Sequence, residues 1–408
     1  PKSCDMTKWS VVACDQYTSE PEYWQDVEEI VGSNPSTLRL TLPEIYLEEA
    51  DVEERIKKIN SNMDELVTND FFKEYKDSLI YLERTQADGK VREGLIGMVD
   101  LEDYSYEKDS TTLIRATEKT VIERIPPRVK VRENAKLELP HIMILIDDDK
   151  KEIIEKLKQK VTEKEKVYDF DLMKNGGHIK GYVLKDKDAN ETLTKLEKLA
   201  DKELFNKKYN LKDKEVLLFA MGDGNHSLAT AKACYENLKK TMPEDEYLKN
   251  PARYALVELV NLHSPALEFE AIHRVLFNVN TKELFKELEK FYDISYEKTA
   301  GQKVDFVTSE KEGTFWIKNP KSNIPVGSLQ LFLDEYLKKH EGKIDYVHGE
   351  DVTKELGHKA GNVGFILEAM SKNELFKTVT LDGALPRKTF SMGHSNDKRY
   401  YLEARRIK

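Results

Sequence analysis

Hydrophobic positions recur along the chain at two different spacings, which predicts alternating strands and helices. Helical spacing is clearest in residues 51–69, where apolar side chains return every three or four positions: Val52, Ile56, Ile59, Met63 and Leu66. Residues 19–32 also predict a helix, because a serine cap and a first-turn proline open the segment and a glycine closes it. The short apolar run 11–17 before this helix predicts a strand that ends in a polar loop.

Two β-hairpins are predicted from apolar runs that flank turn sequences. SLIYLERT and GLIGMVDL lie on either side of QADGK, and KVYDFDLM and HIKGYVLKD lie on either side of Asn175-Gly176-Gly177. Between them, HIMILIDDD predicts a buried strand, and KEIIEKLKQKV predicts a helix after it. A further helix is expected over residues 190–204.

The segment EVLLFAMGDGNHSLATAKACYENLKK gives the clearest pattern in the chain. Val216–Met221 predict a buried strand, the next four residues predict a tight loop, and an amphipathic helix is expected from Ser227 onward. The apolar stretches YALVELVNLH and EFEAIHRVLF follow, and we expect both to join the same sheet.

From about Thr281 the alternation starts again, which predicts a second lobe. We therefore divide the chain into a core (1–278) and a C-terminal α/β lobe (279–408), whose tail packs back on the core. Strands and helices mixed with hairpins predict an α/β fold with a mixed sheet and α+β character.

Composition excludes several classes of protein. The chain has 65 Lys plus Arg against 75 Asp plus Glu, a net charge of −10, which argues against nucleic-acid binding. No run of about 18 apolar residues predicts a membrane span. Its three cysteines show no CxxC spacing, so neither a disulfide framework nor a structural zinc site is expected. These features favour a cytoplasmic protein.

The motif MGDGNHS predicts a phosphate-binding loop. It brings glycines and polar side chains to the junction of a strand and a helix, where a helix start offers unpaired N–H groups and partial positive charge. Asp223 is also a candidate magnesium ligand. The alternative is a glycine-rich turn in which Asn225 or Ser227 merely caps the helix.

A basic stretch and one histidine provide further candidates. Arginine and lysine side chains that suit phosphate cluster in TTLIRATEKTVIERIPPRVKVREN: Arg115, Lys119, Arg124 and Arg128. Its alternative is a solvated face balanced by nearby acids such as Glu118 and Glu123. His178 follows the second glycine turn, and we prefer it to His273 and His394. No GxxxxGK[ST], GxGxxG or GxSxG motif is present.

Six segments together resemble the family catalogued as domain of unknown function 1015: VVACDQYTSEPEYW, IRATEKTVIERIPPRVKVRENA, MKNGGHIKGY, MGDGNHSLATAKA, AIHRVL and LPRKTFSMG. The resemblance covers nearly the whole chain. It implies a core similar to the ParB/sulfiredoxin superfamily, some of whose relatives are kinases of free L-serine. Asp223, Gly224 and His226 match the family's loop pattern, whereas Asn225 and Ser227 replace its usual histidine and arginine.

The resemblance implies a kinase that transfers a phosphoryl group from ATP or ADP, with Mg²⁺, to a free hydroxy amino acid such as L-serine. It implies catalytic roles for Asp223, Glu118 and His226, with Asp223 also a metal ligand. Phosphate would contact the loop and the basic stretch: Gly222, Gly224, Asn225, Ser227, Arg115, Lys119, Arg124 and Arg128. Acceptor binding is expected at Asp15, Gln16, Tyr17 and His178.

Three alternatives to the kinase can be compared with the sequence. A binding module would sense a nucleotide or amino acid without turnover. A ParB-like DNA-binding protein would need a basic helix-turn-helix region and a positive domain, and neither appears. A sulfiredoxin-like reductase would need a reactive cysteine near the loop, whereas the helical Cys234 is expected to be buried. The expected partners are a small-molecule substrate and a nucleotide, with no nucleic acid and no membrane, and a homodimer is compatible with the sequence.

Overall fold

The computed structural model describes residues 1–408, and the chain divides into two units. Unit 1 comprises Pro1–Ala116, Thr120–Leu267 and Gly393–Lys408, and unit 2 comprises Thr117–Lys119 and Glu268–Met392. The division expected at residue 278 therefore lies inside unit 2, and the C-terminal tail from Gly393 belongs to unit 1. None of the helices combines the length and apolar character that crossing a lipid bilayer requires.

A nine-stranded mixed sheet forms the centre of unit 1. Its strands lie in the order β3 (Tyr104–Ser105), β4 (Ile114–Arg115), β9 (Phe219–Asp223), β6 (Met143–Ile146), β10 (Tyr254–Asn261), β2 (Val91–Asp100), β1 (Ser78–Thr85), β8 (His178–Lys185) and β7 (Lys166–Asp171). The pairs β3–β4, β4–β9 and β6–β10 are parallel, and the other pairs are antiparallel. The predicted α/β fold with a mixed sheet and both predicted hairpins are confirmed.

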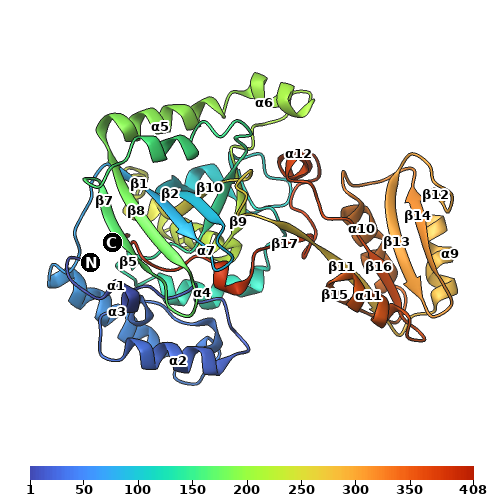
Figure 1. The fold of residues 1–408 in the computed structure, drawn as a ribbon, viewed down its shortest axis with the longest axis horizontal. Coiled ribbons are helices and arrows are strands. Elements are labelled where there is room, and N and C mark those ends of the chain that lie inside the picture. Colours follow the sequence, from blue (N-terminus) through green and yellow to red (C-terminus); the bar gives the residue numbers. More distant parts are fainter. The chain divides into compact units, whose positions relative to one another are not determined.

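Helices cover this sheet (Figure 1). Unit 1 contains α1 (Met6–Trp9), α2 (Pro21–Val31), α3 (Val52–Thr68), α4 (Ile125–Arg132), α5 (Asp186–Lys198), α6 (Lys202–Tyr209), α7 (Asn225–Lys239) and α8 (Glu244–Tyr247). Helix α5 packs along β1 and β8, and α7 packs against α4. The neighbouring side chains Tyr81 and Leu82 belong to two different apolar clusters, so both faces of the sheet are buried, because alternate residues of a strand point to opposite faces.

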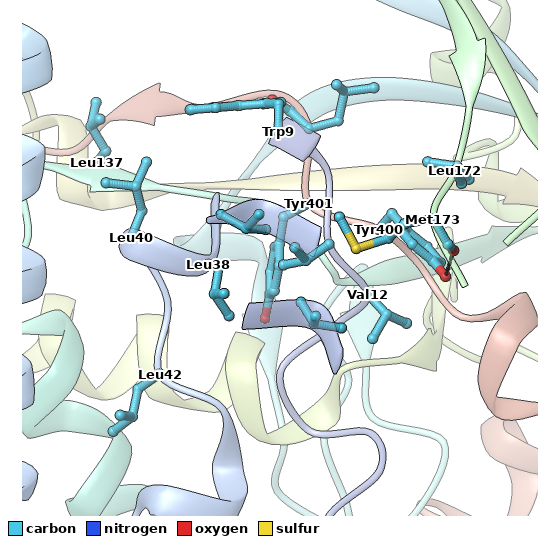
Figure 2. Close-up of a cluster of buried hydrophobic side chains, with 14 of the residues drawn as sticks. Trp9, Val12, Leu38, Leu40, Leu42, Leu137, Leu172, Met173, Tyr400 and Tyr401 are labelled. Carbon is cyan, nitrogen blue, oxygen red and sulfur yellow. Dashed lines mark hydrogen bonds between the residues drawn. The ribbon is translucent and has the colours of Figure 1, made fainter. Parts of the chain in front are cut away.

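One of these clusters joins the two ends of the chain (Figure 2). The indole N–H of Trp9 donates to the carbonyl of Leu402 at 2.9 Å, and the Ser10 hydroxyl donates to the carbonyl of Tyr401 at 2.7 Å. The strand predicted over residues 11–17 is reduced to a single β-bridge between Val12 and Tyr400. The chain turns there instead, since Gln16 N–H bonds back to the carbonyl of Ala13.

Unit 2 is built on a separate antiparallel sheet in the order β12 (Ile294–Ser295), β14 (Glu312–Ile317), β13 (Gln302–Thr308), β16 (Val363–Ile366), β11 (Phe269–Phe277) and β15 (Lys343–His348), with β17 (Phe390–Met392) also on β11. Its helices are α9 (Thr281–Phe291), α10 (Pro325–Leu337), α11 (Glu350–Gly357) and α12 (Leu375–Asp382). A small ladder of β5 (Leu137–Glu138) and β18 (Arg405–Arg406) completes the strands of the chain.

Three local predictions need correction. The stretches 254–263 and 268–277 were expected in one sheet, but β10 and β11 lie in different sheets. The helix expected over 190–204 is two helices, because Asp201 caps a new start at α6. The helix expected after residue 150 shrinks to a 3₁₀ turn at Glu155–Gln159, since the Asp148 carboxylate binds the N–H groups of Glu152 and Ile153 in a local turn.

Candidate functional site

The site predicted from MGDGNHS lies where β9 ends and α7 begins, and glycines shape it. The ladder between β6 and β9 is irregular at this point, because Met143 pairs with Asp223 and Ile144 with Met221, which leaves Gly222 as the extra residue of a bulge. Gly224 has φ +78°, and a Cβ atom there would lie 3.0 Å from the Cα atom of Ile142. The turn therefore requires glycine at position 224.

Helix α7 starts without a side-chain cap. Its N-cap residue is Gly224, whose carbonyl accepts hydrogen bonds from Ser227 N–H and Leu228 N–H. The amide oxygen of Asn225 is buried and has no hydrogen-bond partner, so Asn225 does not cap the helix. An uncapped helix start with partial positive charge is an anion site in many proteins, and the alternative of a merely capped turn is not supported by these contacts.

The Asp223 carboxylate is held between the loop and the C-terminal tail. Its Oδ1 accepts a hydrogen bond from Gly224 N–H at 2.9 Å, and its Oδ2 lies 3.1 Å from Nζ of Lys398, with both side chains half-buried. Sequence reasoning missed Lys398, because nothing in the turn-rich stretch at residues 391–398 sets this lysine apart. Lys398 brings positive charge next to the start of α7.

Two buried arginines hold the backbone that carries Lys398. Arg84 on β1 donates to the carbonyls of Asn396 and Lys398 at 2.7 and 2.9 Å, and Arg92, its partner on β2, donates to the carbonyl of Asp397 at 2.8 Å. Both arginines are 1% exposed. Lys398 therefore stands on a backbone that the central sheet positions.

Ser227, which is half-buried, begins a chain of hydrogen bonds that sequence reasoning also missed. Its Oγ lies 2.6 Å from Nε2 of His141, whose Nδ1 lies 3.1 Å from the hydroxyl of Tyr401. The Tyr401 hydroxyl in turn lies 2.8 Å from Sγ of Cys14 and accepts a bond from Cys14 N–H at 3.0 Å. Tyr401 stands in the middle of the cluster in Figure 2. Four side chains from distant parts of the sequence thus meet at the start of α7.

The loop expected to bind the acceptor continues directly from Cys14. The side-chain amide of Gln16 donates to Asp15 at 3.2 Å, and Tyr17, with φ 53°, stacks on Tyr23 at a ring distance of 3.7 Å. Asp15 and Gln16 are half-buried. They follow Cys14 in the sequence, and the N–H of Cys14 donates to the hydroxyl of Tyr401. The structure therefore brings Asp15 and Gln16 into the same part of unit 1 as Ser227.

The basic candidates divide into different environments. Arg115 is buried, its guanidinium donates to the carbonyls of Thr112, Glu215 and Val216, and this burial lowers its pKa. Arg128 forms an ion pair with Glu44 and also donates to the carbonyl of Arg124, whose side chain is exposed. These contacts give Arg115 a structural role and leave Arg124 available to solvent.

His226 and the segment before α4 lie close together. The N–H of Val121 points at Nε2 of His226 over 3.4 Å, and the preceding Thr120 has a buried hydroxyl without a hydrogen-bond partner. Val121, which precedes α4, therefore lies beside the start of α7.

Two further candidates belong to unit 2. Glu118 forms a β-bridge with Leu385, and Lys119 N–H bonds to the carbonyl of Leu385. Burial raises the pKa of Glu118, although Lys388 and the N–H of Thr389 act in the opposite direction. Both residues are therefore held within unit 2 by the segment at Leu385.

His178 lies apart from the other candidates, at the start of β8. Its two ring nitrogens each lie 2.6 Å from a carboxylate, of Asp171 and of Asp169. Burial lowers the pKa of His178, but these two hydrogen bonds outweigh it and raise the pKa above its usual value. This pairing satisfies the ring locally on the β7–β8 hairpin.

The donors at this site do not build a resident metal centre. No three or more His, Cys, Asp or Glu side chains gather at any point of the chain in a way that could hold an ion. Asp223 is a single carboxylate and already faces Lys398. Magnesium commonly binds through one or two carboxylates together with substrate phosphates, so Asp223 alone is an incomplete magnesium site.

Comparisons with known proteins give one family match and several distant structural likenesses. The family model described as "Protein of unknown function (DUF1015)" matches residues 2–336. No curated protein sequence matches.

Three solved structures illustrate the structural likenesses. A conserved hypothetical protein from Pyrococcus furiosus is 10% identical (TM-score 0.36; 77% of this chain and 95% of that chain covered). A free serine kinase in complex with AMP is 10% identical (TM-score 0.39; 75% and 90%), and C-terminally truncated SbnI from Staphylococcus aureus is 9% identical (TM-score 0.36; 73% and 82%). At these sequence identities and TM-scores, the structural similarity supports no conclusion about function.

Proposed function

Because the chain belongs to the DUF1015 family of proteins of unknown function, we propose the function that its sequence resemblance implies and that the site supports: a small-molecule kinase that transfers the terminal phosphoryl group of ATP or ADP to a free hydroxy amino acid such as L-serine. The observation that carries this proposal is the uncapped start of α7 beside the Asp223–Lys398 pair. A helix start and a lysine together supply the positive field that transferred phosphate needs.

The phosphate groups would lie against the first turn of α7. Gly222 and Gly224 let the backbone turn closely against Leu145 and Ile142 there, and Lys398 would neutralise charge on the phosphate oxygens. Asn225 supports this placement, because its buried amide oxygen lacks a partner in the free protein and a burial cost of this kind is relieved when a ligand donor arrives. An ATP or ADP molecule offers such donors on its ribose.

The acceptor would bind on the side of the loop at residues 14–17. Asp15 supplies a carboxylate for an ammonium group and Gln16 supplies an amide, and both lie next to the chain of hydrogen bonds that ends at Ser227. Asp223 would orient the acceptor's hydroxyl, or take its proton, once phosphate draws Lys398 away. Mg²⁺ would enter with the nucleotide and neutralise phosphate charge.

The first experiment is a direct search for the product. The purified chain is incubated with ATP or ADP, Mg²⁺ and a panel of free amino and hydroxy acids, and phosphorylated products are read by mass spectrometry. Phosphoserine, or another phosphorylated hydroxy amino acid, is the expected product. If nucleotide raises the melting temperature but nothing is phosphorylated, the chain is a nucleotide-binding module; if neither occurs, the proposed phosphate site is wrong.

A pair of lysine variants tests the location of the site. Lys398→Met should weaken nucleotide binding roughly 10- to 100-fold, since a hydrogen bond to a charged group contributes about 1.5 to 3 kcal/mol. The matched control is Lys239→Met at the other end of α7, because Lys239 and Lys398 are both 22% exposed and each pairs with a carboxylate. Equal losses in both variants, measured by calorimetry, would remove Lys398 from the site.

A further inference from the structure

We propose that Ser227 is itself a phosphoryl acceptor, a serine nucleophile inside the site that takes the terminal phosphoryl group from the bound nucleotide. The juxtaposition that supports this is the contact between Ser227 Oγ and His141 Nε2 at the start of α7. The inference rests on the proposed function, because that function places a nucleotide's phosphates at the same helix start.

The pair has the geometry of an activated nucleophile. A serine becomes nucleophilic when a base lies within hydrogen-bond reach and a third group orients that base. Ser227 Oγ and His141 Nε2 are 2.6 Å apart, and Tyr401 contacts the other ring nitrogen of His141 at 3.1 Å. His141 is 9% exposed, so its ring is fixed by packing as well as by these bonds.

The hydrogen bonds around Tyr401 fit the tautomer of His141 that carries its proton on Nδ1. The Tyr401 oxygen accepts from Cys14 N–H, and its own proton points to Cys14 Sγ. The contact between Tyr401 and His141 then needs the proton on Nδ1 of His141. This leaves a lone pair on Nε2, which is the arrangement that accepts the Ser227 proton.

The far end of this chain of hydrogen bonds does not compete for the Ser227 proton. Burial raises the pKa of the Cys14 thiol to about 12 and holds the pKa of the Tyr401 hydroxyl well above its usual value. Both groups therefore stay protonated near neutral pH and act only to orient His141. Cys14 and Tyr401 are positioning residues in this scheme.

The chemical step balances within the groups named. Ser227 Oγ forms a bond to the terminal phosphorus while the bond from that phosphorus to the bridging oxygen breaks. The nucleotide leaves with the electron pair as ADP from ATP, or AMP from ADP, and the Ser227 proton moves to His141 Nε2. The product, a dianionic phosphoserine at a helix start beside an imidazolium, lies where negative charge is stabilised.

The test is a phosphopeptide map of the full chain after incubation with Mg²⁺ and ATP or ADP. Tryptic cleavage after Lys214 and Lys232 yields a peptide in which Ser227 and Thr230 are the only hydroxyl side chains. We expect this peptide to gain about 80 Da, the mass of one phosphate, on Ser227. The gain should vanish in Ser227→Ala and His141→Gln and persist in Thr230→Ala, the neighbouring hydroxyl.

A fluorophosphonate probe gives a second readout that needs no nucleotide. It should label Ser227 in the unmodified chain and fail to label the His141→Gln variant, with circular dichroism showing that the variant is folded. If the chain phosphorylates a free amino acid while Ser227 takes up neither phosphate nor probe, this inference is overturned and the proposed function stands. If no nucleotide binds and nothing is phosphorylated, both are overturned.

Discussion

Gly224 shows how a single backbone conformation shapes the site. Its φ of +78° is one that side chains rarely adopt, and a Cβ atom would also press on the backbone of Ile142 at 3.0 Å. Gly89 has nearly the same conformation, φ +84°, but a Cβ atom there would have no other atom within 4 Å. Comparing substitutions at the two glycines therefore separates the free-energy cost of backbone strain from that of steric conflict.

Replacing each glycine with alanine should give two different costs. Gly89→Ala should lose about 1 to 2 kcal/mol of unfolding free energy through the left-handed backbone alone. Gly224→Ala should lose roughly 1 to 3 kcal/mol more, because the added methyl group has to displace backbone, and it alone should weaken nucleotide binding. Denaturant unfolding and calorimetry check both parts; equal losses of stability would contradict the steric argument.

At the residue scale the sequence could predict what is local. The motif at residues 222–227 can be recognised from the sequence, because glycines and polar side chains follow a buried strand directly. His141 and Lys398 could not be found this way, since they reach the loop only through strand order and the return of the tail. Arg115 shows the opposite case, a basic side chain whose donors are taken by backbone carbonyls.

At the element scale, strands β1 and β2 control the position of the tail. Arg84 donates to three backbone carbonyls, of Gly176, Asn396 and Lys398, and has no carboxylate partner of its own. Burial, followed by the charge of Arg92, lowers the pKa of Arg84 to about 9. Burying a charged guanidinium that binds only carbonyl oxygens costs free energy. This cost indicates that the position of residues 396–398 matters.

Arg84→Met should therefore weaken nucleotide binding, although Arg84 itself would make no contact with the nucleotide. Loss of its bonds frees the backbone at Asn396 and Lys398, and hydrogen exchange there should become faster. Arg253→Met is the control, because Arg253 also donates to a carbonyl and to a carboxylate, of Leu248 and Asp100, away from the tail. Faster exchange without any loss of affinity would separate the tail's order from binding.

The element scale also shows where periodicity stops being informative. Strand β10 and strand β11 are similar apolar runs, and their spacing gives no sign that they join different sheets. Helix prediction failed after residue 150 for a related reason, because the Asp148 side chain supplies hydrogen bonds that favour a local turn. Hairpins were predictable, since their turn residues are contiguous in sequence.

At the scale of the whole molecule, buried ion pairs are concentrated in unit 1. Glu258 lies 3.2 Å from both Arg92 and Arg399, and Glu138 lies 2.5 and 2.6 Å from Arg132 and Arg405. Burial alone would raise the pKa of both carboxyls, but the neighbouring arginines outweigh it and lower them. In unit 2 the glutamates with a lowered pKa, such as Glu335, lie at the surface.

Acid should therefore unfold unit 1 before unit 2. A carboxyl whose pKa is lower in the folded state contributes stability above its unfolded pKa, about 4.3 for Glu, and this contribution is lost as the pH falls through the folded pKa. Protonation of Glu258 would also leave Arg84, Arg92 and Arg399 buried with less negative charge around them. Hydrogen exchange followed by mass spectrometry, at stepwise lower pH, reads each unit separately. Protection should disappear first from β10 and β2; simultaneous loss from β11 and β13 would show that the buried pairs do not set the acid limit.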